Sequence, residues 1–180
     1  MNLWRSFLRM KGWEVDIDPL PPSKCVICVA PHTSNWDFIY GLAAYRSLGR
    51  KANFLMKEAW FFFPMKYLFR SLGGIPVPKL KGSSLTERII GCFNESSYMN
   101  LAITPEGTRS YADKWRKGFL YISYGADVPV YLGVIDYKNK RIIIRRKLEE
   151  SGDADTDLGK VKEFYSRYRD AARYPEKFGV

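Results

Sequence analysis

The sequence predicts a single α/β domain with a mixed, mostly parallel sheet that is covered by helices. Short apolar runs rich in β-branched residues alternate with segments whose apolar residues recur at helical spacing, which is typical of strands joined by crossover helices. The last two apolar runs are separated only by a short polar turn, so we expect them to pair antiparallel. A chain of 180 residues is long enough for one domain with a sizeable core.

The first part of the chain is expected to form an amphipathic helix and then a buried strand. Residues 1–18 place apolar side chains at helical spacing between arginines, which fits both an interfacial helix that touches a membrane and a helix packed on the core. The proline-rich connector at 19–23 cannot continue that helix. Residues 25–30 are continuously apolar and predict a buried strand, and 37–48 have the spacing of a helix.

The next stretch predicts a second strand and helix, with many aromatic rings. Residues 52–56 are a short strand candidate, and 59–72 are expected to form a helix that Pro64 kinks or divides. So dense a run of aromatic side chains cannot all face one core, and part of it is expected to be exposed or to face lipid. Glycines and prolines at 73–79 predict an edge strand or an extended loop.

The second half of the chain continues the alternation. The expected elements are a helix at 84–95, a strand at 99–104, two antiparallel strands at 128–135 and 141–145, an acidic linker at 152–157 and a last helix. The main domain is therefore expected to span 19–150, with 151–180 forming a C-terminal helix packed on it.

The chain is strongly basic, with 29 Lys and Arg against 19 Asp and Glu and a formal charge of +10. Such an excess favours anionic partners, namely phosphorylated metabolites, nucleic acid or acidic lipid headgroups. Three cysteines are too few for a disulfide framework, no signal peptide is recognisable, and no apolar stretch reaches the ~18 residues of a membrane span. These features predict a cytoplasmic protein that does not cross a bilayer.

The only histidine, His32, lies in a polar run after the first buried strand, five residues before Asp37. An imidazole transfers protons near neutral pH, and a carboxylate beside it fixes its tautomer. Positions five apart diverge by roughly 140° on a helix, so the two side chains meet only if His32 precedes the helix that contains Asp37. The run from Ser34 to Asp37 also matches a helix capping box, which requires no catalysis.

A second polar turn, Thr104 to Ser110, follows another apolar strand. Its proline and glycine fit a β-turn that fixes the orientation of Glu106 and Arg109. An arginine at such a turn is suited to bind a phosphate through two hydrogen bonds. Because the carboxyl ends of parallel strands lie at one edge of a sheet, we expect His32 and Glu106 to converge there.

Together these two motifs resemble those of the lysophosphatidate and glycerol-phosphate acyltransferase family. His32-x-x-x-x-Asp37 is followed about 70 residues later by the run Pro-Glu-Gly-Thr-Arg-Ser at 105–110, and each motif comes after an apolar strand. The similarity extends from about residue 19 to about residue 147.

The resemblance implies the glycerol-3-phosphate acyltransferase fold and transfer of a fatty acyl group from acyl-CoA or acyl-carrier protein to a hydroxyl of a lysophospholipid or related lyso-lipid. His32 is then the general base and Asp37 its orienter. The resemblance assigns acceptor binding to Glu106, Gly107, Thr108 and Arg109. It implies no metal, no cofactor beyond the thioester co-substrate and no nucleic acid, and it places the protein on the inner face of the cell membrane in phospholipid biosynthesis.

The sequence departs from the family pattern in the middle motif, which usually ends in an arginine after two glycines. Here Gly73 and Gly74 are followed by Ile-Pro-Val-Pro and then Lys79. Lys79 keeps the positive charge for phosphate binding but lacks the planar fork of arginine. The acceptor is therefore lysophosphatidate or a lyso-lipid with another headgroup.

Two other interpretations also fit parts of the sequence. Cys25, Cys28, Cys92 and His32 add up to a zinc-ligand set, but residues three apart on a strand point to opposite faces. A cysteine nucleophile beside His32 requires the thiol to lie at the end of the strand. The main alternative from another class is a non-catalytic basic module that binds a membrane surface or RNA through the cations at 138–147.

Overall fold

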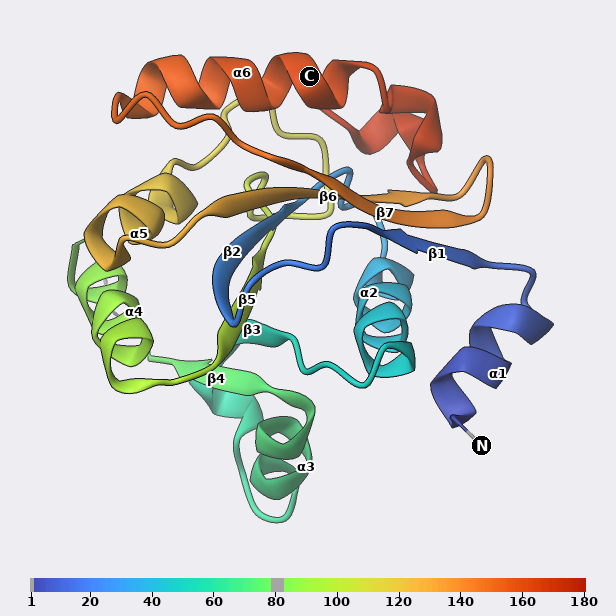
Figure 1. The fold of residues 1–180 in the computed structure, drawn as a ribbon, viewed down its shortest axis with the longest axis horizontal. Coiled ribbons are helices and arrows are strands. Elements are labelled where there is room, and N and C mark those ends of the chain that lie inside the picture. Colours follow the sequence, from blue (N-terminus) through green and yellow to red (C-terminus); the bar gives the residue numbers. More distant parts are fainter. Residues whose placement is uncertain (1, 79–82) are drawn as a thin grey trace.

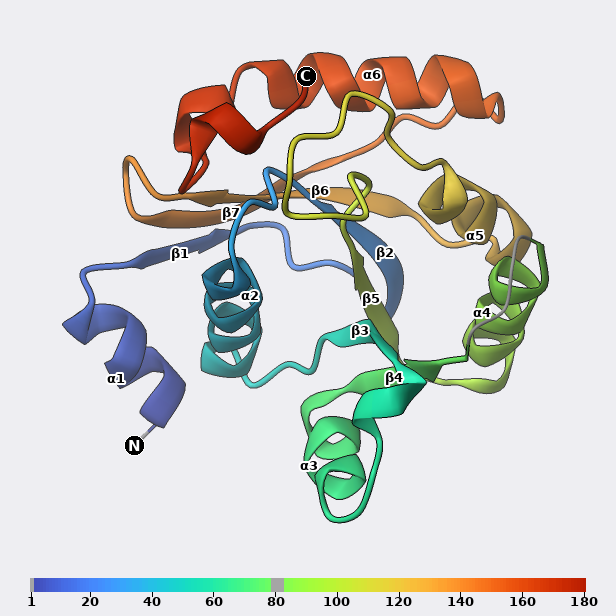
Figure 2. The same ribbon diagram turned by 180° about the vertical axis from the view of Figure 1, so that it is seen from behind.

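The computed structural model describes residues 2–78 and 83–180 (Figure 1). Its elements are α1 (Leu3–Met10), β1 (Glu14–Ile17), β2 (Lys24–Val29), α2 (Asn35–Ser47), β3 (Asn53–Lys57), α3 (Met65–Leu72), β4 (Gly74–Val77), α4 (Ser83–Glu95), β5 (Met99–Ile103), α5 (Gly118–Ala126), β6 (Val130–Asp136), β7 (Arg141–Lys147) and α6 (Ala154–Ser166). They form three layers, with the sheet between α1 and α2 on one face and α4, α5 and α6 on the other (Figures 1 and 2).

In the described residues, the strands form one seven-stranded sheet in the order β1-β7-β6-β2-β5-β3-β4. β6 and β7 pair antiparallel, and the other neighbouring strands pair parallel. This confirms the predicted single α/β domain with a mixed, mostly parallel sheet. The glycine- and proline-containing strand β4 lies at the sheet edge, where proline is tolerated because one side of the strand needs no partner.

Strand β2 lies inside the sheet and is covered on both faces. Cys25 and Ile27 pack with residues of α1 and α2, whereas Val26 and Cys28 pack with residues of α4, α5 and α6. β2 runs parallel to β5, which in turn runs parallel to β3. The segments that follow these three strands therefore start from the same edge of the sheet.

One element differs from the sequence prediction, and for another the structure decides between the two predicted alternatives. β1 adds an edge strand beside β7, within the 1–18 segment for which the sequence predicts only a helix. The expected helix at 59–72 is divided, because a 3₁₀ turn ends at Trp60 and α3 begins only after Pro64. Of the two predicted outcomes at Pro64, a kink or a division, the structure therefore confirms the division.

Two helices of the second half also differ from expectation. α5 lacks the polar face that makes a helix recognisable in sequence, because it packs against α4, α6 and the sheet at once. α6 begins inside the predicted acidic linker, where Asp153 caps it by accepting a hydrogen bond of 2.8 Å from the Thr156 N–H.

Helix α1 packs its apolar side against α2. Leu8 is buried, and the ring of Phe7 stacks on that of Tyr40 with 6.1 Å between centroids. Leu3 and Met10 stay exposed. Packing on the core is thus observed for this helix, while its contact with a membrane stays a prediction. Within residues 2–78 and 83–180, no helix has both the length and the apolar character needed to cross a bilayer.

Candidate active site

The candidate site begins where β2 ends and α2 starts. Ser34 has the extended backbone of an N-cap residue, and its Oγ accepts a hydrogen bond of 3.2 Å from the Trp36 N–H. His32 stands just before this cap, and Asp37 lies in the first turn of the helix. Their side chains meet, with His32 Nδ1 3.1 Å from Asp37 Oδ2.

The Asp37 carboxylate is buried, and both of its oxygens have hydrogen-bond partners. Oδ2 accepts the backbone N–H groups of Thr33 at 2.8 Å and Ser34 at 2.9 Å as well as facing the imidazole, and Oδ1 accepts the Tyr137 hydroxyl at 2.5 Å. The capping box is therefore present together with the contact to histidine. With Nδ1 directed at Asp37, the Nε2 atom of His32 remains available to take a proton from a substrate.

Glu106 approaches His32 from the end of β5. The Gly107 N–H donates to the Thr104 carbonyl at 3.2 Å, which closes the predicted turn. Both carboxylate oxygens of Glu106 accept the His32 backbone N–H, at 3.0 and 3.2 Å. Burial raises the pKa of Glu106 to about 7, the His32 N–H opposes that shift, and the charge of Asp37 adds to it. The predicted convergence of His32 and Glu106 is thus observed.

The other residues of the predicted acceptor-binding block lie at the surface. Gly107, Thr108 and Arg109 are exposed, and Gly107 has a positive φ of 66°. The side chain of Arg116 lies over Gly107, because a Cβ built there would stand 2.7 Å from Arg116 Nε. Two arginines, Arg109 and Arg116, therefore lie beside the turn that holds Glu106. Lys79 lies outside the described residues.

Sequence reasoning missed the contribution of Tyr137, which lies between β6 and β7. Burial and its hydrogen bond to Asp37 raise the pKa of Tyr137 above the ordinary value for tyrosine, so the hydroxyl stays protonated as a donor. Arg173 covers the Tyr137 ring with its guanidinium carbon 5.8 Å from the centroid. No local pattern marks Tyr137, because the sheet topology alone brings it to a residue 100 positions earlier.

The segment after α6 also reaches the site. The Tyr174 N–H donates to Thr33 Oγ1 at 3.2 Å, beside His32. The Trp115 indole N–H donates to the Gly179 carbonyl at 2.9 Å, and Phe178 is buried against the Trp115 ring. The loops that carry His32 and Glu106 are therefore both tied to residues 174–179.

The cysteines do not form the alternative sites considered from the sequence. Cys25 and Cys28 belong to the core clusters on opposite faces of the sheet. Burial raises the pKa of Cys25 to about 12 and that of Cys28 still further, so neither supplies a thiolate near neutral pH. Across the described ranges, no group of three or more His, Cys, Asp or Glu side chains is placed to hold a metal ion.

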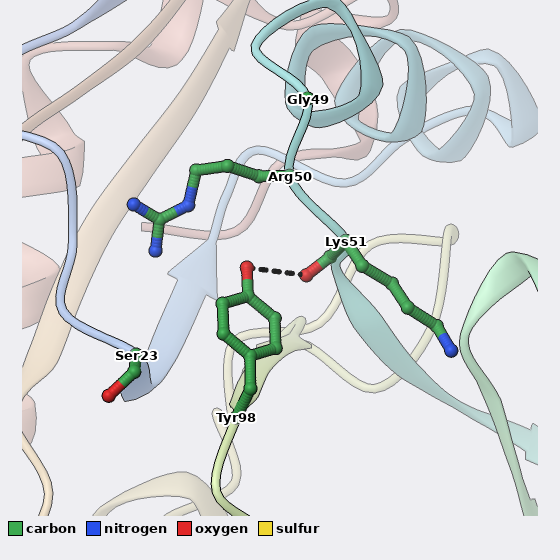
Figure 3. A pocket seen from close by; sticks show the side chains of 5 residues that line it. All are labelled: Ser23, Gly49, Arg50, Lys51 and Tyr98. Atoms are coloured by element: carbon green, nitrogen blue, oxygen red, sulfur yellow. Dashed lines mark hydrogen bonds between the residues drawn. The ribbon is translucent and has the colours of Figure 1, made fainter.

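A separate surface hollow of about 470 Å³ lies at the opposite edge of the sheet (Figure 3). Its lining residues are Ser23, Gly49, Arg50, Lys51 and Tyr98. Ser23 precedes β2 and Tyr98 precedes β5, so the hollow adjoins the amino ends of the strands whose carboxyl ends carry His32 and Glu106. This hollow is therefore not part of the candidate site.

The fold and the site define the class of protein. A family model described as Acyltransferase matches residues 14–135, and the chain belongs to that family. The crystal structure of the 1-acyl-sn-glycerophosphate (LPA) acyltransferase, PlsC, from Thermotoga maritima is similar to this chain with a TM-score of 0.59 and 18% sequence identity. The match covers 95% of this chain and 78% of that one, which confirms the predicted fold. A search of curated proteins finds no match.

Proposed function

We propose that this acyltransferase moves a fatty acyl group from an acyl thioester, carried by coenzyme A or acyl-carrier protein, to a hydroxyl of a lysophospholipid. The main support for the proposal is the contact between His32 Nδ1 and Asp37 Oδ2 at 3.1 Å, which lies at the carboxyl end of β2. The chain that carries this contact is a member of the Acyltransferase family. General base catalysis of this kind contributes roughly 10²- to 10⁴-fold to the rate.

In the proposed reaction, His32 Nε2 removes the proton from the acceptor hydroxyl as its oxygen attacks the thioester carbonyl carbon. Asp37 holds the Nδ1–H and stabilises the imidazolium that forms. The tetrahedral intermediate collapses by breaking the carbon–sulfur bond, and the thiol leaves with the proton that His32 carried. The resemblance assigns Glu106 to acceptor binding, but we propose instead that it acts through the backbone, since its buried carboxylate holds the His32 N–H with both oxygens.

An anionic acceptor fits the charge around this site. Arg109 and Arg116 are exposed beside the turn of Glu106, and the whole chain carries a formal charge of +10. A lyso-lipid with a phosphate in its headgroup supplies the matching negative charge, with Gly107, Thr108 and Lys79 as further acceptor-binding candidates. We propose peripheral attachment to the inner face of the cell membrane, where such an acceptor resides, and a role in phospholipid biosynthesis.

The direct test is thiol release by the purified protein from acyl-CoA or acyl-carrier protein, in the presence of lysophosphatidate or of lyso-lipids with other headgroups. Turnover with one acceptor, and its loss by at least about 10²-fold in His32→Ala, is the expected result. Circular dichroism of the variant serves as the folding control. Absence of thiol release with every pair of donor and acceptor would contradict the enzyme and favour a non-catalytic basic module.

A further inference from the structure

An aromatic projection leaves the sheet between β3 and β4. It consists of residues 58–72, which include α3, and it stands away from the three layers at the bottom of Figure 1. The side chains that it exposes are large and apolar: Phe63 is 75% exposed, Tyr67 62%, Trp60 55%, Phe62 55% and Leu68 48%. A patch of this kind on the surface of a folded domain marks a surface that contacts another apolar phase.

The projection is fastened to the domain by other rings. Phe61 and Phe69 contact each other edge-to-face with 6.0 Å between centroids. Phe61 also covers Gly74 of β4, where a Cβ would stand 3.2 Å from its ring and 3.3 Å from that of Phe54. Phe61 and Phe69 therefore attach the projection to the rest of the domain. The exposed rings named above are different residues, and the rest of the described chain leaves them largely uncovered.

Basic side chains accompany the exposed rings. Lys57 and Arg70 are exposed at the base of the projection, and Lys66 lies with its Nζ 5.0 Å from the centroid of the Tyr67 ring. Glu58 is the one acidic residue among 57–72. Aromatic rings at headgroup depth, flanked by cations, match the interface of a bilayer that contains anionic lipid.

The projection shares an edge of the sheet with the candidate site. β3 leads into it, β2 leads to His32, and both strands run parallel to β5. Phe38, one residue after Asp37, contacts Phe54 of β3 edge-to-face with 4.5 Å between centroids. The strand that leads into the projection therefore contacts the helix that carries Asp37, which connects the projection to the candidate site.

From these contacts we infer that the aromatic projection docks the protein onto an anionic bilayer, with Phe62 and Phe63 inserted among the headgroups and Lys57, Lys66 and Arg70 near the phosphates. The inference deepens the proposed membrane attachment and rests on it, but vesicle binding is measured without turnover. Helix α1 is the competing element, and its apolar side is already packed on α2.

The test is cosedimentation with vesicles of phosphatidylcholine alone or mixed with phosphatidylglycerol. The wild-type protein is expected to bind the anionic vesicles more strongly, and added salt is expected to weaken that binding. Phe62→Ser/Phe63→Ser removes two exposed rings and is expected to weaken binding by about tenfold or more. Leu3→Ser/Met10→Ser is the matched control, since these α1 side chains are 74% and 77% exposed.

Unchanged binding by the Phe62→Ser/Phe63→Ser variant would overturn the inference, as would loss of binding only in the Leu3→Ser/Met10→Ser variant or no vesicle binding by the wild type. A short-chain, water-soluble lyso-lipid separates this inference from the proposed function. The Phe62→Ser/Phe63→Ser variant is expected to keep wild-type turnover with that acceptor while losing turnover with acceptor embedded in vesicles. Equal loss with both acceptors would also contradict a docking role.

Discussion

The Tyr137 hydroxyl donates a hydrogen bond of 2.5 Å to Asp37 Oδ1, while Oδ2 of the same carboxylate faces His32. Tyr137 lies two residues beyond the stretch that matches the family model. A residue from the turn after β6 thus completes the environment of the acid in the first motif. Its hydrogen bond stabilises the negative charge of Asp37 and restricts the orientation of the carboxylate.

Tyr137→Phe removes this hydroxyl and keeps the ring, which meets the rings of Trp13 and Tyr40 edge-to-face. We expect kcat to fall by about tenfold with little change in KM, because the orientation of Asp37 loosens. The measurements are steady-state kinetics and thermal unfolding of the variant beside the wild type. An unchanged kcat with a lower melting temperature would reduce Tyr137 to a structural residue.

Asp37→Asn and Ser34→Ala separate capping from catalysis. Ser34→Ala removes the oxygen that accepts the Trp36 N–H and is expected to lower stability by about 1 kcal/mol with a small effect on kcat. Asp37→Asn is expected to reduce kcat by at least about 10²-fold, because an amide does not stabilise an imidazolium. Urea unfolding and steady-state kinetics on both variants give the comparison. Equal losses of activity would mean that Asp37 acts only as a cap.

The raised pKa of Glu106 leads us to expect that its contribution to the stability of the protein decreases as the pH rises. Its folded pKa of about 7 exceeds the ordinary glutamate pKa of 4.5, so the unfolded chain releases this proton first as the pH rises. The contribution of Glu106 to stability therefore falls between about pH 4.5 and 7, by up to about 3 kcal/mol. Glu106→Gln retains an acceptor for the His32 N–H but cannot ionise.

We accordingly expect Glu106→Gln to gain stability relative to wild type as the pH rises from 4.5 to 8. The measurement is urea unfolding of both proteins at several pH values in that range. A stability difference that stays constant with pH would show that Glu106 ionises at the same pH in the folded and unfolded chains.

Gly107→Ala tests the close approach of Arg116. The φ of 66° is unfavourable for alanine, and the new Cβ would collide with Arg116 Nε at 2.7 Å. We expect a loss of about 1–2 kcal/mol in stability and a higher KM for an anionic acceptor, because Arg116 is displaced. Gly152→Ala is the control, since it shares a positive φ but has open space around it. An unchanged KM would exclude Arg116 from acceptor binding.

Site residues that directly follow buried strands could be predicted from the sequence. Site residues that reach the site only through packing between distant parts of the chain could not. His32, Asp37 and Glu106 were predictable as neighbours, because each follows a buried apolar strand and parallel strands end at one edge. Tyr137 and Tyr174 carry no such signal, since only the assembled sheet and the path after α6 bring them to the first motif. β1 was missed because four residues alternate too briefly to stand out beside a helix.

The ties made by residues 174–179 have a consequence for how the protein matures in the cell. Thr33, beside His32, is held by the Tyr174 N–H, and Trp115, on the loop after Glu106, is held by the Gly179 carbonyl. A growing chain that stops short of residue 174 already contains every residue of the two motifs but lacks both clamps. We therefore expect nascent chains to acquire a rigid site only once residues 174–179 have left the ribosome, which delays acyl transfer until synthesis has passed that point.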